Sequence, residues 1–75
     1  MLNSSTLQKI WSLIEITSTQ TILGKSDREL VLYLLRQLEN KHDLNLQEYD
    51  SATDYIYSKM TLIRDLADSR ELVAL

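Results

Sequence analysis

Apolar residues recur every three or four positions through most of this 75-residue chain, as they do along one face of an amphipathic helix. The first such set consists of Leu7, Ile10, Trp11 and Ile14. Ser5 and Gln8 stand at the spacing of a helix capping box. The pattern predicts a helix over residues 5–18. Its regularity decays in the polar, β-branched run 17–21, which we expect to be a fraying helix end or a short extended stretch.

The clearest helix start in the sequence is the segment Ser26-Asp27-Arg28-Glu29. Ser and Glu three residues apart form a capping box, and acids in the first turn interact favourably with the helix dipole. The core-facing positions that follow are Leu30, Val31, Leu34, Leu35 and Leu38. They predict a helix over residues 26–41, with Gly24 turning the chain before it. Leu32 and Tyr33 lie outside this stripe, so this helix has apolar side chains on more than one side.

A third apolar series follows Asn45 and Glu48, which are again at capping-box spacing. Its predicted core face is formed by Leu46, Tyr49, Ala52, Ile56, Met60, Ile63 and Ala67, and a flanking stripe is formed by Tyr55, Leu62 and Leu66. The series predicts a helix over residues 46–70, about 37 Å long at ~1.5 Å per residue. A compact domain of this size is narrower than that. We therefore expect the helix end to project or to pack against a second copy.

Turn-forming residues are almost absent, since the chain has one Gly and no Pro. Sheets need such residues at their turns, so the composition also favours helices. The predicted fold class is all-α: one domain, residues 1–75, forming a three-helix bundle or an open helical hairpin with a long third helix. Because the chain has no Cys, no disulfide can stabilise so small a core. We therefore expect a homodimer to complete the fold.

The net charge of −3 is unevenly distributed. Residues 1–47 contain five acids and five bases, whereas residues 48–75 contain six acids and three bases. The acidic C-terminal third favours a protein partner with a basic surface, and the lack of a basic stripe argues against nucleic acid. The longest apolar run has six residues, against ~18 for a membrane span, and the N-terminus does not resemble a signal peptide. We expect a cytoplasmic protein without membrane contact.

Few residues offer catalytic or metal-binding chemistry. Asp50 and Asp54 are four apart, with Glu48 nearby, and paired carboxylates can hold a divalent cation. Acids near a helix start, however, ordinarily complement its dipole. His42 and Asp43 could form a catalytic pair in principle, but sequence neighbours rarely point at one another, and a single His cannot build a usual zinc site. We expect no enzymatic activity, no cofactor and no metal.

The Tyr residues give the best indication of a binding surface, because Tyr is large, rigid and enriched in protein interfaces. Tyr57 lies outside both stripes of its predicted helix and is expected to be exposed. Leu32, Tyr33 and Tyr57 therefore form the predicted partner-binding set. Trp11 and Tyr49 continue core stripes and are expected inside, where the indole N–H of Trp11 would need an acceptor.

The predicted function is a small, non-enzymatic adaptor or regulatory protein that binds another protein. One alternative is a DNA-associated regulator whose second and third helices form a helix-turn-helix. It is disfavoured because the third helix begins with several acids. A second is a carboxylate-dependent enzyme or metal-binding protein, disfavoured because a short chain has little room for a pocket of ~300 Å³. Near the end of the third helix, a solvated face is predicted for Arg64, Asp65, Asp68, Arg70 and Glu71, with a local ion pair between Arg64 and Asp68. Residues 71–75 could dock, dimerise or be disordered.

Overall fold

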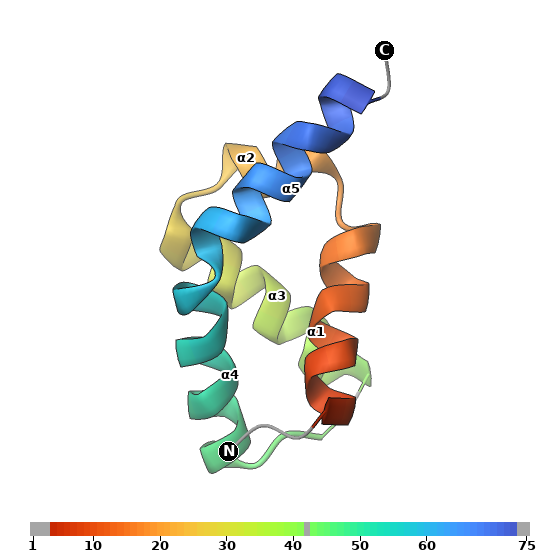
Figure 1. Ribbon diagram of the computed structural model, residues 1–75. Helices are drawn as coiled ribbons and strands as arrows, with labels where there is room; N and C mark the ends of the chain where they lie inside the picture. Colours follow the sequence, from red (N-terminus) through yellow and green to blue (C-terminus); the bar gives the residue numbers. More distant parts are fainter. Residues whose placement is uncertain (1–3, 42, 74–75) are drawn as a thin grey trace.

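The structure, a computed structural model, describes the backbone of residues 4–41 and 43–73 and the side chains up to residue 70. Within these ranges the chain forms helices and no strand, which confirms the all-α class (Figure 1). The helices are α1 (Ser4–Ile16), α2 (Thr19–Gly24), α3 (Asp27–Lys41), α4 (Leu46–Ser58) and α5 (Met60–Val73). The predictions made for His42 and for the tail side chains after residue 70 lie outside the described residues.

All five helices contribute buried side chains to a common hydrophobic core. The largest share comes from α3, which lies behind α1 and α4 in Figure 1. Its buried residues are Leu30, Val31, Leu34, Leu35 and Leu38, the five positions predicted from the spacing. The predicted apolar stripe therefore coincides with the buried face of α3. The helix predicted over residues 26–41 is confirmed.

The first helix is shorter than the predicted range 5–18 and begins one residue earlier. Ser5 lies inside its first turn, so the predicted cap at Ser5 is wrong. At the other end, Thr17 leaves the helix, and both its backbone N–H and its hydroxyl donate to the carbonyl of Leu13, at 3.0 and 2.6 Å. A Thr side chain that bonds its own preceding turn in this way competes with continued helix formation.

The run 17–21, predicted to be frayed or extended, instead contains the start of α2. The hydroxyl of Ser18 accepts a hydrogen bond from the backbone N–H of Thr21 at 3.2 Å, as an N-cap does. Ile22, one turn after the cap, is fully buried in the core. The cap and this burial outweigh the low helix propensity of Thr. Gly24, which was expected to turn the chain, is the last residue of this short helix.

The helix predicted over residues 46–70 is in fact two helices, α4 and α5, joined at Lys59. Lys59 has φ −105° and ψ 7°, which departs from helical geometry. Just before it, the hydroxyl of Ser58 donates to the carbonyl of Tyr55 at 2.7 Å, a side-chain bond of a kind that bends helices. After the joint, α5 changes direction and packs against α2 (Figure 1). The length of a single third helix therefore gives no reason for a second copy.

Two predictions about the apolar stripes have opposite outcomes. Trp11 is half-buried, and its indole N–H donates to the hydroxyl of Tyr55 at 2.8 Å, so the expected acceptor is present. The two rings meet edge to face, with centroids 6.4 Å apart. Leu46, in contrast, was placed on the core face but is 84% exposed. It is the first residue of α4, where no other helix covers the stripe.

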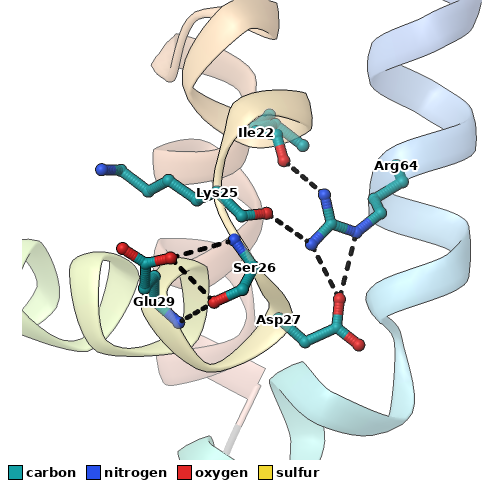
Figure 2. Close-up of polar contacts among 6 residues, drawn as sticks. All are labelled: Ile22, Lys25, Ser26, Asp27, Glu29 and Arg64. Atoms are coloured by element: carbon teal, nitrogen blue, oxygen red, sulfur yellow. Dashed lines mark hydrogen bonds and ion pairs between the residues drawn. The ribbon is translucent and has the colours of Figure 1, made fainter.

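Arg64 of α5 connects three segments of the chain (Figure 2). Its guanidinium donates to the backbone carbonyl of Ile22 at 2.7 Å and to that of Lys25 at 2.9 Å. It also pairs with the carboxylate of Asp27, at 2.7 Å. Carbonyls at a helix end have no partner within the helix, and a cation there also interacts favourably with the dipole. One side chain thus holds the end of α2 and the start of α3 against α5.

Arg70, also on α5, donates hydrogen bonds to backbone carbonyls at the end of α1 in the same way. Its guanidinium donates to the carbonyls of Ile14 and Thr17, both at 3.1 Å. The predicted solvated face is therefore wrong for both arginines of α5. Each is turned towards the carboxyl end of another helix, and the ion pair expected within α5 is made with α3 instead.

The two later capping boxes are present as predicted. The backbone N–H of Glu48 donates to the side chain of Asn45 at 2.8 Å, and the Glu48 carboxylate accepts from the backbone N–H of Asn45 at 3.4 Å. At the start of α3, the Glu29 carboxylate accepts from both the backbone N–H and the hydroxyl of Ser26, at 3.4 and 2.9 Å (Figure 2). Short-range sequence signals thus place both helix starts correctly.

The hydroxyl and the backbone N–H of Ser26 lower the pKa of Glu29 below its ordinary value of 4.5, because both stabilise the charged carboxylate. A depressed pKa adds stability at pH values above the ordinary one, and this contribution is lost as the pH falls through the depressed value. We therefore expect the Tm, followed by circular dichroism, to fall less between about pH 7 and about pH 3 in Glu29→Gln than in the wild type. Ser26→Ala should also weaken the dependence of the Tm on pH. If this dependence were the same in both variants as in the wild type, the stabilising contact between Ser26 and the charged Glu29 carboxylate would be contradicted.

Candidate interaction surface

Leu32 and Tyr33 flank the outer face of α3. Successive helix residues are about 100° apart around the axis, so these two fall on either side of the face opposite the core stripe. Glu29 and Arg36 lie along the middle of that face and are exposed. Leu32 is 46% exposed, and Tyr33 is half-buried against the edge of the core. The structure thus brings two of the three predicted anchors together on one surface.

These residues line a shallow hollow of about 210 Å³ together with Lys25. The Lys25 ammonium lies 5.6 Å from the centre of the Tyr33 ring, a cation–π contact that limits the ring's freedom. The hollow is smaller than a usual small-molecule site of ~300–1,000 Å³, and three of its five lining side chains are charged. It is therefore better suited to side chains of another protein than to an enclosed small ligand.

Tyr57, the third predicted anchor, has a different setting on α4. It is 43% exposed and does not line the hollow formed by Leu32 and Tyr33. Asp50, Asp54 and Tyr57 stand at positions i, i+4 and i+7, so they share one stripe of the helix, and all three are exposed. We call this set the Tyr57 stripe. It presents an aromatic side chain beside two carboxylates.

A groove between α1 and α3 was missed by the sequence reasoning. Its volume is about 290 Å³, and its lining residues are Lys9, Ser12, Leu13, Ile16, Leu38 and Lys41. Ile16 is 72% exposed and lies immediately before the run 17–21 in which the helical pattern decays. The available signal was that Ile16 continues a stripe with Lys9 and Leu13 at i, i+4 and i+7. The groove combines apolar side chains with two ammonium groups and has no acid in its lining.

Metal-binding chemistry finds little support in the described part of the chain. There, no group of three His, Cys, Asp or Glu side chains could hold a metal ion. Asp50 and Asp54 are both exposed on the surface of α4. The disfavoured alternative of a catalytic pair between His42 and Asp43 cannot be placed, because His42 lies outside the described residues. Acids on an exposed helix face beside a Tyr fit a binding surface better than a reaction centre.

Comparisons with models of known protein families, with curated proteins and with solved structures found no match to this chain. None of the described helices is both long enough and apolar enough to cross a bilayer.

Proposed function

We propose that this chain is a small, non-enzymatic adaptor or regulatory protein that acts by binding other protein chains through Leu32, Tyr33 and Tyr57. The observation that carries the proposal is the exposure of Leu32 and Tyr57 on helices whose opposite faces are already buried. Covering a large apolar side chain contributes about 1.5–3 kcal/mol. Tyr is also among the residues that most often dominate binding energies.

The charge around Tyr57 favours a partner with a basic surface. Asp50 and Asp54 are exposed beside it. Of the three bases in residues 48–75, Arg64 and Arg70 donate to carbonyls of other helices, so most of their hydrogen-bond donors are not available to a partner. Complementary charge of this kind mainly raises the association rate.

We also propose that the protein works in the cytoplasm as a homodimer. A chain without Cys is compatible with a reducing compartment. Self-association is supported by the apolar side chains that the five helices leave exposed, among them Leu32, Leu62 and Leu66. Small domains frequently obtain part of their stability from a second subunit.

Partner capture from an extract of the protein's own cells tests the proposal. The immobilised wild-type chain is compared with Tyr33→Ala/Tyr57→Ala. We expect the double variant to retain its helical circular dichroism spectrum and to lose about 10-fold or more in captured partner, since two hot-spot side chains are removed. The matched control, Leu23→Ala/Leu46→Ala, removes two other exposed apolar side chains and should capture as the wild type does. Equal capture by both double variants would refute the assigned anchors.

A further inference from the structure

The outer face of α3 has a charge pattern that is complementary to itself. Glu29 stands at one end, Leu32 and Tyr33 in the middle, and Arg36 at the other end. The acid and the base are equally distant from the midpoint between Leu32 and Tyr33, by three and a half residues or about 5 Å along the helix. A 180° rotation of the helix about an axis that passes through this midpoint, perpendicular to the outer face, therefore exchanges the position of the acid with that of the base. It also exchanges the position of Leu32 with that of Tyr33.

We infer that two copies of the chain pack their α3 helices antiparallel across a two-fold axis that passes between Leu32 and Tyr33. Glu29 of each copy then faces Arg36 of the other, while the two Leu32 side chains meet on one side of the helix pair and the two Tyr33 side chains meet on the other. Such an isologous contact forms the pair of Glu29 with Arg36 twice. The inference rests on the homodimer of the proposed function. It assigns Leu32 and Tyr33 to a second copy and leaves Tyr57, on another helix, to a different partner.

The groups needed for this contact are available on the described surface. Glu29, Leu32 and Arg36 are all exposed, and Arg36 forms no ion pair with any residue that the structure describes. The backbone N–H and the hydroxyl of Ser26 both donate to the same carboxylate oxygen of Glu29, Oε1. The second oxygen, Oε2, remains open to a guanidinium. The capping box of α3 and the contact with a second copy can therefore exist together.

Charge decides the direction in which the two helices run. A parallel pair in register would place Glu29 against Glu29 and Arg36 against Arg36, and like charges in an interface are costly. The antiparallel pair replaces both repulsions with attractions. A contact based on one helix of 15 residues, about 22 Å long, is small among protein interfaces. We therefore expect a reversible dimer whose Kd is on the order of tens of micromolar.

Charge reversal tests the arrangement by sedimentation velocity over roughly 1–500 µM, a range centred on that expected Kd. Arg36→Glu gives each copy two acids on this face, and Glu29→Arg gives each copy two bases. We expect each variant by itself to raise the Kd at least about 10-fold, since both symmetric pairs become repulsive. An equal mixture of the two should form a heterodimer at least as tight as the wild-type homodimer. The matched control is Lys41→Glu, a reversal on the groove side of the same helix, which should dimerise as the wild type does.

Recovery of association in the mixture also shows that neither variant had simply failed to fold, and circular dichroism of each provides a second check. A wild type that stays monomeric throughout the range would overturn the inference. So would Arg36→Glu dimerising as tightly as the wild type, or a mixture of the two variants that stays monomeric. Partner capture by Arg36→Glu, with and without Tyr57→Ala, tests the proposed function independently of the dimer.

Discussion

Replacing Leu34 with Ala should lower the free energy of unfolding by about 2–5 kcal/mol, because the truncated side chain leaves a cavity that its neighbours fill only in part. Leu34 is 1% exposed in the middle of the core stripe of α3. A 75-residue domain is stabilised by roughly 4–11 kcal/mol in total, at about 0.05–0.15 kcal/mol per residue. This single truncation should therefore remove a large share of the stability and could unfold part of the population at 37 °C.

Leu32→Ala is the matched control, since it makes the same chemical change two positions earlier on the same helix. Leu32 lies on the exposed side, so its truncation should change the stability by no more than about 0.5 kcal/mol. Urea unfolding followed by circular dichroism measures both, at concentrations low enough that self-association adds nothing. Equal losses in the two variants would contradict the assignment of inner and outer faces of α3.

Replacing Arg64 with Ala should lower the free energy of unfolding by about 1.5–3 kcal/mol, the range for hydrogen bonds made by charged groups. The variant leaves the carbonyls of Ile22 and Lys25 without their donor, at the joint between α2 and α3. The ion pair with the exposed Asp27 carboxylate should contribute little, because solvent screens such pairs. We also expect the amides of α2 to exchange hydrogen faster in the variant than in the wild type, since Arg64 holds the carbonyls of Ile22 and Lys25 at the end of this short helix.

Two further substitutions separate geometry from charge in this measurement. Arg64→Lys keeps the charge, but an ammonium is a compact point charge and lacks the planar fork that reaches several acceptors. Its stability should lie between those of the wild type and Arg64→Ala. Arg28→Ala removes an exposed arginine from the first turn of α3 and should stay within about 0.5 kcal/mol of the wild type. An Arg64→Ala variant as stable as Arg28→Ala would show that the helix ends do not depend on this side chain.

The candidate surface could be read from the sequence only in part. Leu32 and Tyr57 lie outside their apolar stripes, and the structure leaves both exposed. Periodicity identifies the side of a helix on which a residue lies, but not which sides the other helices cover. For that reason Leu46 is exposed although it lies on the predicted core stripe of its helix. Ile16, in turn, lines a groove that the pattern did not indicate.

The features of this protein that could be predicted from its sequence are local. The helical class, the capping boxes of α3 and α4, and the core stripe of α3 all depend on residues within one or two turns of each other, and such short-range patterns can be read directly. The tertiary structure alone decided the break at Lys59, the helix α2, and the inward positions of Arg64 and Arg70. The carbonyls and the carboxylate that hold these arginines are 37 to 56 residues away in the chain. Contacts at that separation exist only once the helices have packed.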